Sequence, residues 1–270
     1  MSFFVDILPA MADNYIYLVG DSDLGLAMVV DPGDVEPVRR ALKSRDVNLE
    51  LILLTHHHKD HTAGAMALAE EFGAPILGPA KEKTLLEGLS RGVSGGEVVA
   101  FSTLRGQVLD TSGHTIGHVA YYFPQIKALF CGDALFSLGC GRLFEGTAAQ
   151  MWEALKLMRG LPDDTQVYFG HEYTEANARF ALAVDKTNEA ILARLAEVVA
   201  LRAEKKPAVP VALKVEKAAN PFLRIDQPDF HKAIARSGLP LQGTDPAALF
   251  GCLRAAKDRF DSQQAPMGRK

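Results

Sequence analysis

The sequence predicts a layered α/β fold over residues 1–173 and a smaller helical domain over residues 174–270. In the first part, short apolar runs bounded by Gly, Pro and Asp alternate with longer amphipathic segments, as strands alternate with helices. After Tyr173 the composition shifts to helix-forming residues. With 48% hydrophobic residues, the chain can bury a substantial core. We therefore expect sheets covered by helices, followed by helices alone.

The individual elements follow from the same patterns. Strands are expected at 3–8, 15–19, 25–31, 49–55, 97–100, 107–111, 120–123, 127–131 and 165–169. Helices are expected at 35–43, 61–72 and 150–159, and residues 174–205 are rich in helix formers. The stretch 206–221 contains prolines and few helix signals, and a last helix is predicted to start at Thr244, Asp245 or Pro246.

Composition and charge exclude several classes of function. The 270 residues carry a net charge of -4 and have no long basic stripe, which argues against a nucleic-acid or membrane-surface partner. No apolar run approaches the ~20 residues of a membrane span, and the N-terminus lacks the basic start of a signal peptide. Three cysteines without CxxC spacing suit reduced thiols. We expect a cytoplasmic protein.

The run THHHKDH follows one of the apolar strands and predicts a metal site. In an extended chain, side chains two positions apart point the same way, so His56 and His58 can face one point while His57 faces elsewhere. Asp60 and His61 follow where the chain turns into a helix, which can bring them back to the same region. Imidazole and carboxylate are good ligands for first-row metals. Solvated loop histidines are the alternative, and the preceding buried strand argues against them.

One segment cannot surround an ion from all sides, and three other strand ends supply further candidates. His114, Asp133 and His171 each lie just after a Gly that follows an apolar strand. The Gly allows a tight turn at the sheet edge. Each residue alone suits a structural role, but together with THHHKDH they predict a shared metal site. The spacing identifies seven positions and does not divide them between ions.

The runs THHHKDH, GHTIGH, CGDALF and GHEYT resemble the ordered motifs of the metallo-β-lactamase superfamily. More narrowly, the chain resembles the glyoxalase II (hydroxyacylglutathione hydrolase) family through DNYIYLV, DPGD, GCGRLFEGTA, GHEYTEANARFA, NPFLR and LRAAKDRF. This resemblance covers nearly the whole length. It implies a four-layer αββα sandwich with metals at the edge of its two sheets, followed by a smaller all-helical C-terminal domain.

The resemblance also implies two divalent metal ions per chain. Zinc is expected, and iron and manganese suit the same ligands. The implied assignment gives one metal to His56, His58 and His114, gives the other to Asp60, His61 and His171, and makes Asp133 the bridge. Asp60 and Asp133 would flank a metal-bridging hydroxide, the implied nucleophile. Asp31 and His118 are candidates for orienting the ligands.

The implied reaction is hydrolysis of S-(2-hydroxyacyl)glutathione, typically S-D-lactoylglutathione, to glutathione and a 2-hydroxy acid such as D-lactate, in methylglyoxal detoxification. The chain has neither GxSxG nor a Walker loop, which fits a metal-activated water. The family's glutathione-binding positions fall on Arg142, Phe144, Tyr173, Arg254 and Lys257. Arg142 stands where Lys is usual and Phe144 where Tyr is usual, so one hydroxyl is lost.

Three other functions share the scaffold or its ligands. Glutathione persulfide dioxygenases use one iron and the same HxHxDH run, but they typically lack the long helical C-terminus. Another metallo-β-lactamase-fold hydrolase is a second alternative, and a nucleic-acid-processing enzyme is disfavoured by the acidic net charge. We expect a monomer.

Overall fold

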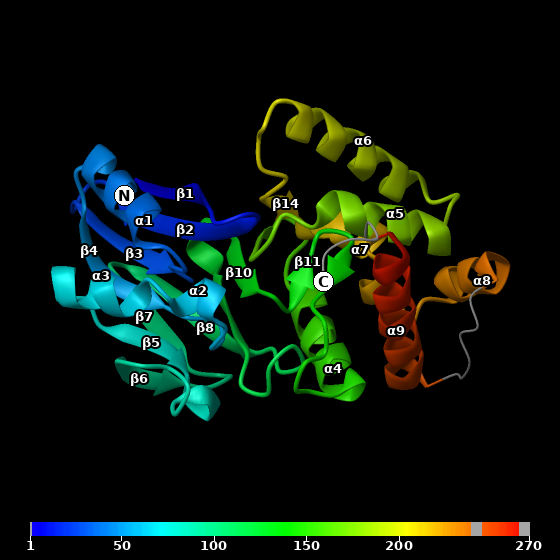
Figure 1. The fold of residues 1–270 in the computed structure, drawn as a ribbon, viewed down its shortest axis with the longest axis horizontal. Helices are drawn as coiled ribbons and strands as arrows, with labels where there is room; N and C mark the ends of the chain where they lie inside the picture. Colours follow the sequence, from blue (N-terminus) through cyan, green and yellow to red (C-terminus); the bar gives the residue numbers. More distant parts are fainter. Residues whose placement is uncertain (1, 239–244, 265–270) are drawn as a thin grey trace.

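The structure is a computed structural model that describes residues 2–238 and 245–264. It contains two six-stranded sheets, and the first of them lies at the left of Figure 1. The first sheet contains β1 (Phe3–Ala10), β2 (Asn14–Asp21), β3 (Leu26–Val30), β4 (Asn48–Leu53), β5 (Ile76–Pro79) and β6 (Leu89–Val93), in that order. The second runs β14-β13-β10-β9-β8-β7, formed by β7 (Val98–Phe101), β8 (Leu104–Asp110), β9 (Val119–Phe123), β10 (Ala128–Gly132), β13 (Gln166–Phe169) and β14 (Val211–Ala212).

Burial on both faces explains why strands such as β2, β9 and β10 appear in the sequence as largely apolar runs. In β2, Tyr17 and Val19 belong to the core between the sheets, while Ile16 and Leu18 pack toward the helical layer on the other side. That layer consists of α1 (Val35–Arg45) and α3 (Ala65–Phe72).

The opposite layer contains α4 (Ala148–Arg159), whose buried Met151, Trp152 and Leu155 belong to the same continuous apolar cluster as the residues of the second sheet. A capping box starts this helix, because Thr147 accepts from the Gln150 backbone and the Gln150 side chain accepts from Thr147. The order helix, sheet, sheet, helix confirms the predicted αββα sandwich.

The C-terminal region is helical, as predicted. Its helices are α5 (Thr174–Val184), α6 (Glu189–Ala203), α7 (Leu213–Ala219), α8 (Pro228–Ser237) and α9 (Pro246–Gln264), and they lie on the side of the molecule away from β1–β6 (Figure 1). Asp245 accepts a hydrogen bond from the Ala248 N–H at the start of α9, and Thr244 lies outside the described residues. The domain boundary after Tyr173 stays a prediction.

Several details differ from the sequence expectation. The predicted helix over 61–72 is two helices, α2 (Lys59–Thr62) and α3. The break occurs at Gly64, whose N–H donates to the Pro32 carbonyl at 2.9 Å and whose Cα lies against that carbonyl too closely for a side chain. Strands β5, β6 and β14 and the small hairpin of β11 (Leu135–Phe136) and β12 (Gly139–Cys140) were not predicted. Helix α7 forms within the stretch 206–221, where few helix signals were seen, and α8 was not predicted either. Among the described helices, none combines the length and apolar character that a membrane span requires.

Candidate metal centre and substrate pocket

The candidate ligands lie on loops that leave neighbouring strands at one edge of the two sheets. The run THHHKDH follows β4, His114 lies between β8 and β9, Asp133 follows β10, and His171 follows β13. Two glycines make this convergence possible. Gly132 has a φ of +46°, and a side chain there would collide with Thr55 Oγ1. A side chain at Gly170 would collide with Asp133 Oδ1 and the His61 ring, so both glycines are needed for close approach.

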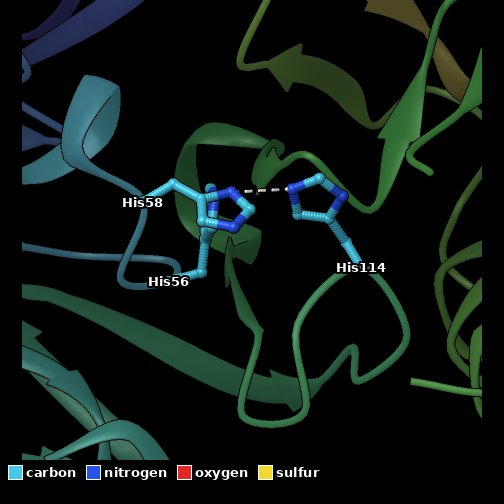
Figure 2. A group of neighbouring side chains, drawn as sticks. All are labelled: His56, His58 and His114. Atoms are coloured by element: carbon cyan, nitrogen blue, oxygen red, sulfur yellow. Dashed lines mark hydrogen bonds between the residues drawn. The ribbon is translucent and has the colours of Figure 1, made fainter. Parts of the chain in front are cut away.

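The first group of donors consists of His56, His58 and His114 (Figure 2). His58 Nδ1 lies 3.0 Å from His56 Nε2 and 3.0 Å from His114 Nε2. Figure 2 shows the rings of His58 and His114 facing each other, although they come from different sheets. Burial lowers the pKa of all three imidazoles, and that of His56 falls well below its usual value. These rings are therefore neutral, the form that coordinates metals.

The second group consists of Asp60, His61 and His171. His61 Nε2 lies 3.2 Å from His171 Nε2, and Asp60 Oδ2 lies 3.3 Å from the same His171 nitrogen. The hydrogen bond from His171 lowers the pKa of Asp60, although burial acts in the opposite direction. Burial tends to lower the pKa of His171, but hydrogen bonds to Asp133 and Asp60 outweigh it and raise this pKa to about 11.

Asp133 lies between the two groups. Its Oδ2 is 3.4 Å from His114 Nε2 and 3.4 Å from His171 Nε2, while its Oδ1 is 3.4 Å from His61 Nε2. Burial tends to raise the pKa of Asp133, but the surrounding imidazoles, His61 first, lower it strongly, so the group is a carboxylate. This side chain contacts both groups, as a bridging ligand would.

The donor set fits a pair of divalent first-row metals. Oδ1 of Asp133 is buried and has no hydrogen-bond partner among the described residues, an arrangement that protein interiors avoid unless something else is bound. Ring nitrogens of five histidines and two carboxylates converge on the same small volume. Imidazole and carboxylate donors suit zinc, iron and manganese. A divalent metal site at this edge therefore matches the chemistry of the residues.

The far ring nitrogens of His56 and His61 are held by neighbouring side chains, which directs the other nitrogen of each ring inward. His61 Nδ1 lies 3.1 Å from Asp31 Oδ2. This carboxylate also accepts from the backbone and hydroxyl of Thr55, at 2.7 and 2.6 Å. The Thr55 hydroxyl in turn lies 3.0 Å from His56 Nδ1. Asp31 therefore contacts the candidate ligands as an orienting residue would.

His118 is buried next to the same centre. Its ring stacks on His56 with centroids 4.9 Å apart, its Nδ1 lies 2.7 Å from Thr111 Oγ1, and its Nε2 accepts from the Asp133 N–H at 3.2 Å. Since that tautomer donates to the Thr111 hydroxyl and accepts from the Asp133 N–H, His118 fixes the backbone at Asp133. Its contacts fit the orienting role that the sequence suggested.

His57 makes different contacts from the rest of the run. Its Nδ1 lies 3.0 Å from Glu82 Oε2 and its Nε2 lies 3.3 Å from Glu145 Oε1. The buried Glu82 also accepts from the Gly117 N–H at 2.9 Å and from the Thr115 hydroxyl. His57 and Glu82 thus join the loop after β4 to the loop that contains His114.

A cavity of about 520 Å³ opens beside Asp133 and brings together every predicted substrate residue. Its walls include Arg142, Phe144, Tyr173, Arg254 and Lys257. The two cations on α9 are buried rather than solvated, and the Arg254 guanidinium donates to the Cys140 carbonyl at 2.7 Å. Burial lowers the pKa of Lys257, against the opposing effect of Asp261 at 2.6 Å.

The two aromatic residues connect this cavity to the metal centre. The Tyr173 ring stacks on His171 with centroids 4.9 Å apart and an interplanar angle of 1°. Phe144 is 61% exposed and presents its ring to His58 and His114, at 5.7 and 5.2 Å between centroids. Both rings therefore lie where a bound molecule would meet the candidate metal ligands.

Comparison with known proteins identifies the family to which the chain belongs. A family profile described as "Metallo-beta-lactamase superfamily" matches residues 13–171, and one described as "Hydroxyacylglutathione hydrolase C-terminus" matches residues 172–260. A protein of Rhodospirillum rubrum named hydroxyacylglutathione hydrolase is 46% identical over 253 residues, covering 94% of this chain and 97% of that protein. The chain belongs to the hydroxyacylglutathione hydrolase family of the metallo-β-lactamase superfamily. The resemblance seen in the sequence motifs is thus confirmed.

Several solved structures have the same fold as this member of the hydroxyacylglutathione hydrolase family. ETHE1 from Myxococcus xanthus is 26% identical, has a TM-score of 0.63 and covers 96% of this chain and 100% of its own. The protein TTHA1623 in a di-iron-bound form is 25% identical, has a TM-score of 0.58 and covers 82% of this chain and 100% of its own.

Sequence reasoning missed several residues that contact this family's motifs in the present chain. Asp13 lies against His171, Asn14 against Asp60, and Glu82 against His57. Asp13 and His171 are 158 positions apart, and no local pattern joins them. The only sequence signal was that Asp13 and Asn14 open the DNYIYLV motif.

Proposed function

We propose that the protein is a metal-dependent thioesterase that hydrolyses S-(2-hydroxyacyl)glutathione, typically S-D-lactoylglutathione, to glutathione and a 2-hydroxy acid such as D-lactate. The observation that supports it most is the cavity that joins Asp133 to the buried cations Arg254 and Lys257. A site of this kind places a reactive centre next to a binding surface for carboxylates. The named function of the 46% identical relative agrees with it.

In this proposal two metal ions bind each chain. His56, His58 and His114 would hold one, Asp60, His61 and His171 the other, and Asp133 both. When bound, such ions supply a water of lowered pKa and positive charge for a developing oxyanion. The solved relative in a di-iron-bound form supports a pair of ions. Zinc as the metal, a monomeric state and a cytoplasmic location are our predictions from the sequence.

The protein's own groups bind and orient the substrate. Glutathione carries two carboxylates, and Arg142, Arg254 and Lys257 offer cations for them. Burial raises the pKa of the Tyr173 phenol, so this hydroxyl stays protonated and can donate a hydrogen bond into the cavity. The leaving thiol has an ordinary pKa near ~8.5. A thiolate therefore leaves without a strong general acid, and we assign none.

The direct test follows thiol release from S-D-lactoylglutathione by the purified protein. We expect release that depends on bound metal and stops when the metal is chelated. No release above background, with metal bound, would end this proposal. Oxygen consumption with glutathione persulfide would instead indicate the dioxygenase alternative.

Lys257→Met is expected to raise the KM for S-D-lactoylglutathione about tenfold and to leave kcat nearly unchanged. Losing one charge-assisted contact costs ~1.4 kcal/mol, and the contact is equally strong in the ground and transition states. Steady-state kinetics would check this, with Lys127→Met as the control, since Lys127 is exposed and pairs with Asp164. A fall in kcat with an unchanged KM would contradict a binding role for Lys257.

Phe144→Tyr is expected to lower the same KM about threefold, because it adds a hydroxyl that can form one net hydrogen bond of ~0.7 kcal/mol. The exposed ring leaves room for that group at the cavity wall. The measurement is KM for S-D-lactoylglutathione beside KM for a thioester whose thiol carries no carboxylate or amine. An equal change for both substrates would show that the hydroxyl does not contact the glutathione moiety.

A further inference from the structure

The turn between β1 and β2 lies directly against two candidate ligands that come from different parts of the fold. The loop containing His171 is joined to this turn by backbone hydrogen bonds on both sides. Tyr15 N–H donates to the Gly170 carbonyl at 2.9 Å, and Glu172 N–H donates to the Asp13 carbonyl at 2.8 Å. Asn14 and His171 form an isolated β-bridge between them. The turn and the ligand loop are therefore one structural unit.

Side chains of the same turn reach the ligand atoms themselves. Asp13 Oδ1 lies 2.9 Å from His171 Nδ1, so the opposite nitrogen, Nε2, faces Asp60 and Asp133. Stacking on Tyr173 sets the plane of this imidazole, and the Asp13 contact sets its rotation within that plane. A carboxylate in this position also makes an imidazole a better metal donor.

Asn14 acts on the other ligand. Its Nδ2 donates to Asp60 Oδ2 at 3.0 Å and to the Asp60 carbonyl at 3.3 Å. The carboxylate oxygen that receives this bond is the one that lies 3.3 Å from His171 Nε2. Two adjacent residues thus hold one ligand from α2 and one from the loop after β13.

Among the described residues, the group of His56, His58 and His114 receives no hydrogen bond from Asp13 or Asn14. Its outward ring nitrogens contact uncharged partners, since His56 Nδ1 lies 3.0 Å from the Thr55 hydroxyl and His114 Nδ1 lies 2.9 Å from the Arg142 carbonyl. The turn touches neither ring through any hydrogen bond found in the described residues. Its influence should therefore be confined to one of the two metals.

We propose that Asp13 and Asn14 are positioning residues that set the affinity of the site formed by Asp60, His61 and His171, and not that of the other site. The inference rests on the two-metal assignment of the proposed function. Asp13 is 41% exposed at the side chain and lines a separate cavity of about 340 Å³, so removing it should not disturb the core.

The test measures metal retention, not only activity. The purified proteins are equilibrated with graded concentrations of a chelator, and metal per chain is determined. We expect Asp13→Ala to lose one of its two metals at a chelator concentration about 10- to 100-fold lower than the wild type needs. Retention of the second metal should not change. Asp13→Asn keeps an acceptor oxygen without the charge and should fall between them. Asn14→Ala should weaken the same site.

Glu175→Gln is the matched control, because Glu175 lines the same cavity and pairs with Arg179 but contacts no candidate ligand. It should retain both metals, and the metal-free Asp13→Ala protein should melt close to the metal-free wild type, since only the contact of a partly exposed carboxylate with His171 is lost. The inference would be overturned if the Asp13→Ala protein bound metal at both sites as tightly as the wild type. Parallel loss of both metals, with a lower metal-free melting temperature, would overturn it too. If the wild type itself binds no metal pair, the failure belongs to the proposed function.

Discussion

Asp133→Asn should lower thioester hydrolysis by about three orders of magnitude or more and should weaken the binding of both metals. The substitution keeps the shape of the side chain but removes the charge that contacts His61, His114 and His171. Metal ions contribute several kcal/mol to charge stabilisation in hydrolytic reactions, and each 1.4 kcal/mol is a factor of ten in rate. Substituting a residue that contacts both groups should therefore lower activity more than a substitution at any other single position.

The experiment compares kcat/KM and metal content of Asp133→Asn with those of Asp164→Asn. Asp164 is exposed and pairs with the exposed Lys127, so this control should behave like the wild type. Circular dichroism of both proteins checks that the fold is kept. A variant that keeps two tightly bound metals and full activity would exclude Asp133 as their shared ligand.

Secondary structure could be predicted from the sequence wherever burial alone determines whether a segment forms a strand. Strands such as β2 and β3 are apolar on both faces because a helical layer and the second sheet cover them, and the sequence displays that directly. The strand β6 reads LSRGV, and three of its residues are exposed or half-buried polar or glycine positions, so its pattern did not stand out. The break before α3 depends on a contact between Gly64 and Pro32, which lies in a different turn.

The candidate site also has a part that the sequence could predict and a part that it could not. Its seven metal-binding candidates lie at strand ends after a buried run, so local spacing was enough to locate them. Their division into two groups depends on distances between loops, and spacing did not provide it. Residues that hold the ligands, such as Asp13 and Glu82, act across large sequence separations, where no periodicity applies.

Removal of both metals with a chelator should abolish hydrolysis and lower the melting temperature by roughly 10 °C. The physical reason is linkage, since a ligand that binds only the folded state at a thousand times its Kd adds ~4 kcal/mol of stability. For a chain of this size, each kcal/mol corresponds to roughly 2–4 °C. Metal bound in the proposed way would also neutralise the carboxylates of Asp60 and Asp133, which lie in a partly desolvated centre.

Stepwise return of zinc, iron or manganese to the metal-free protein then separates one metal from two. If the groups around His114 and His171 both bind and both matter, activity should rise until about two equivalents per chain and then level off. His171→Ala should level off at one equivalent with much lower activity, because His171 belongs to only one group. Full activity of the wild type at one equivalent would contradict the binuclear assignment, while a plateau at two would agree with one ion in each group, on either side of the Asp133 carboxylate.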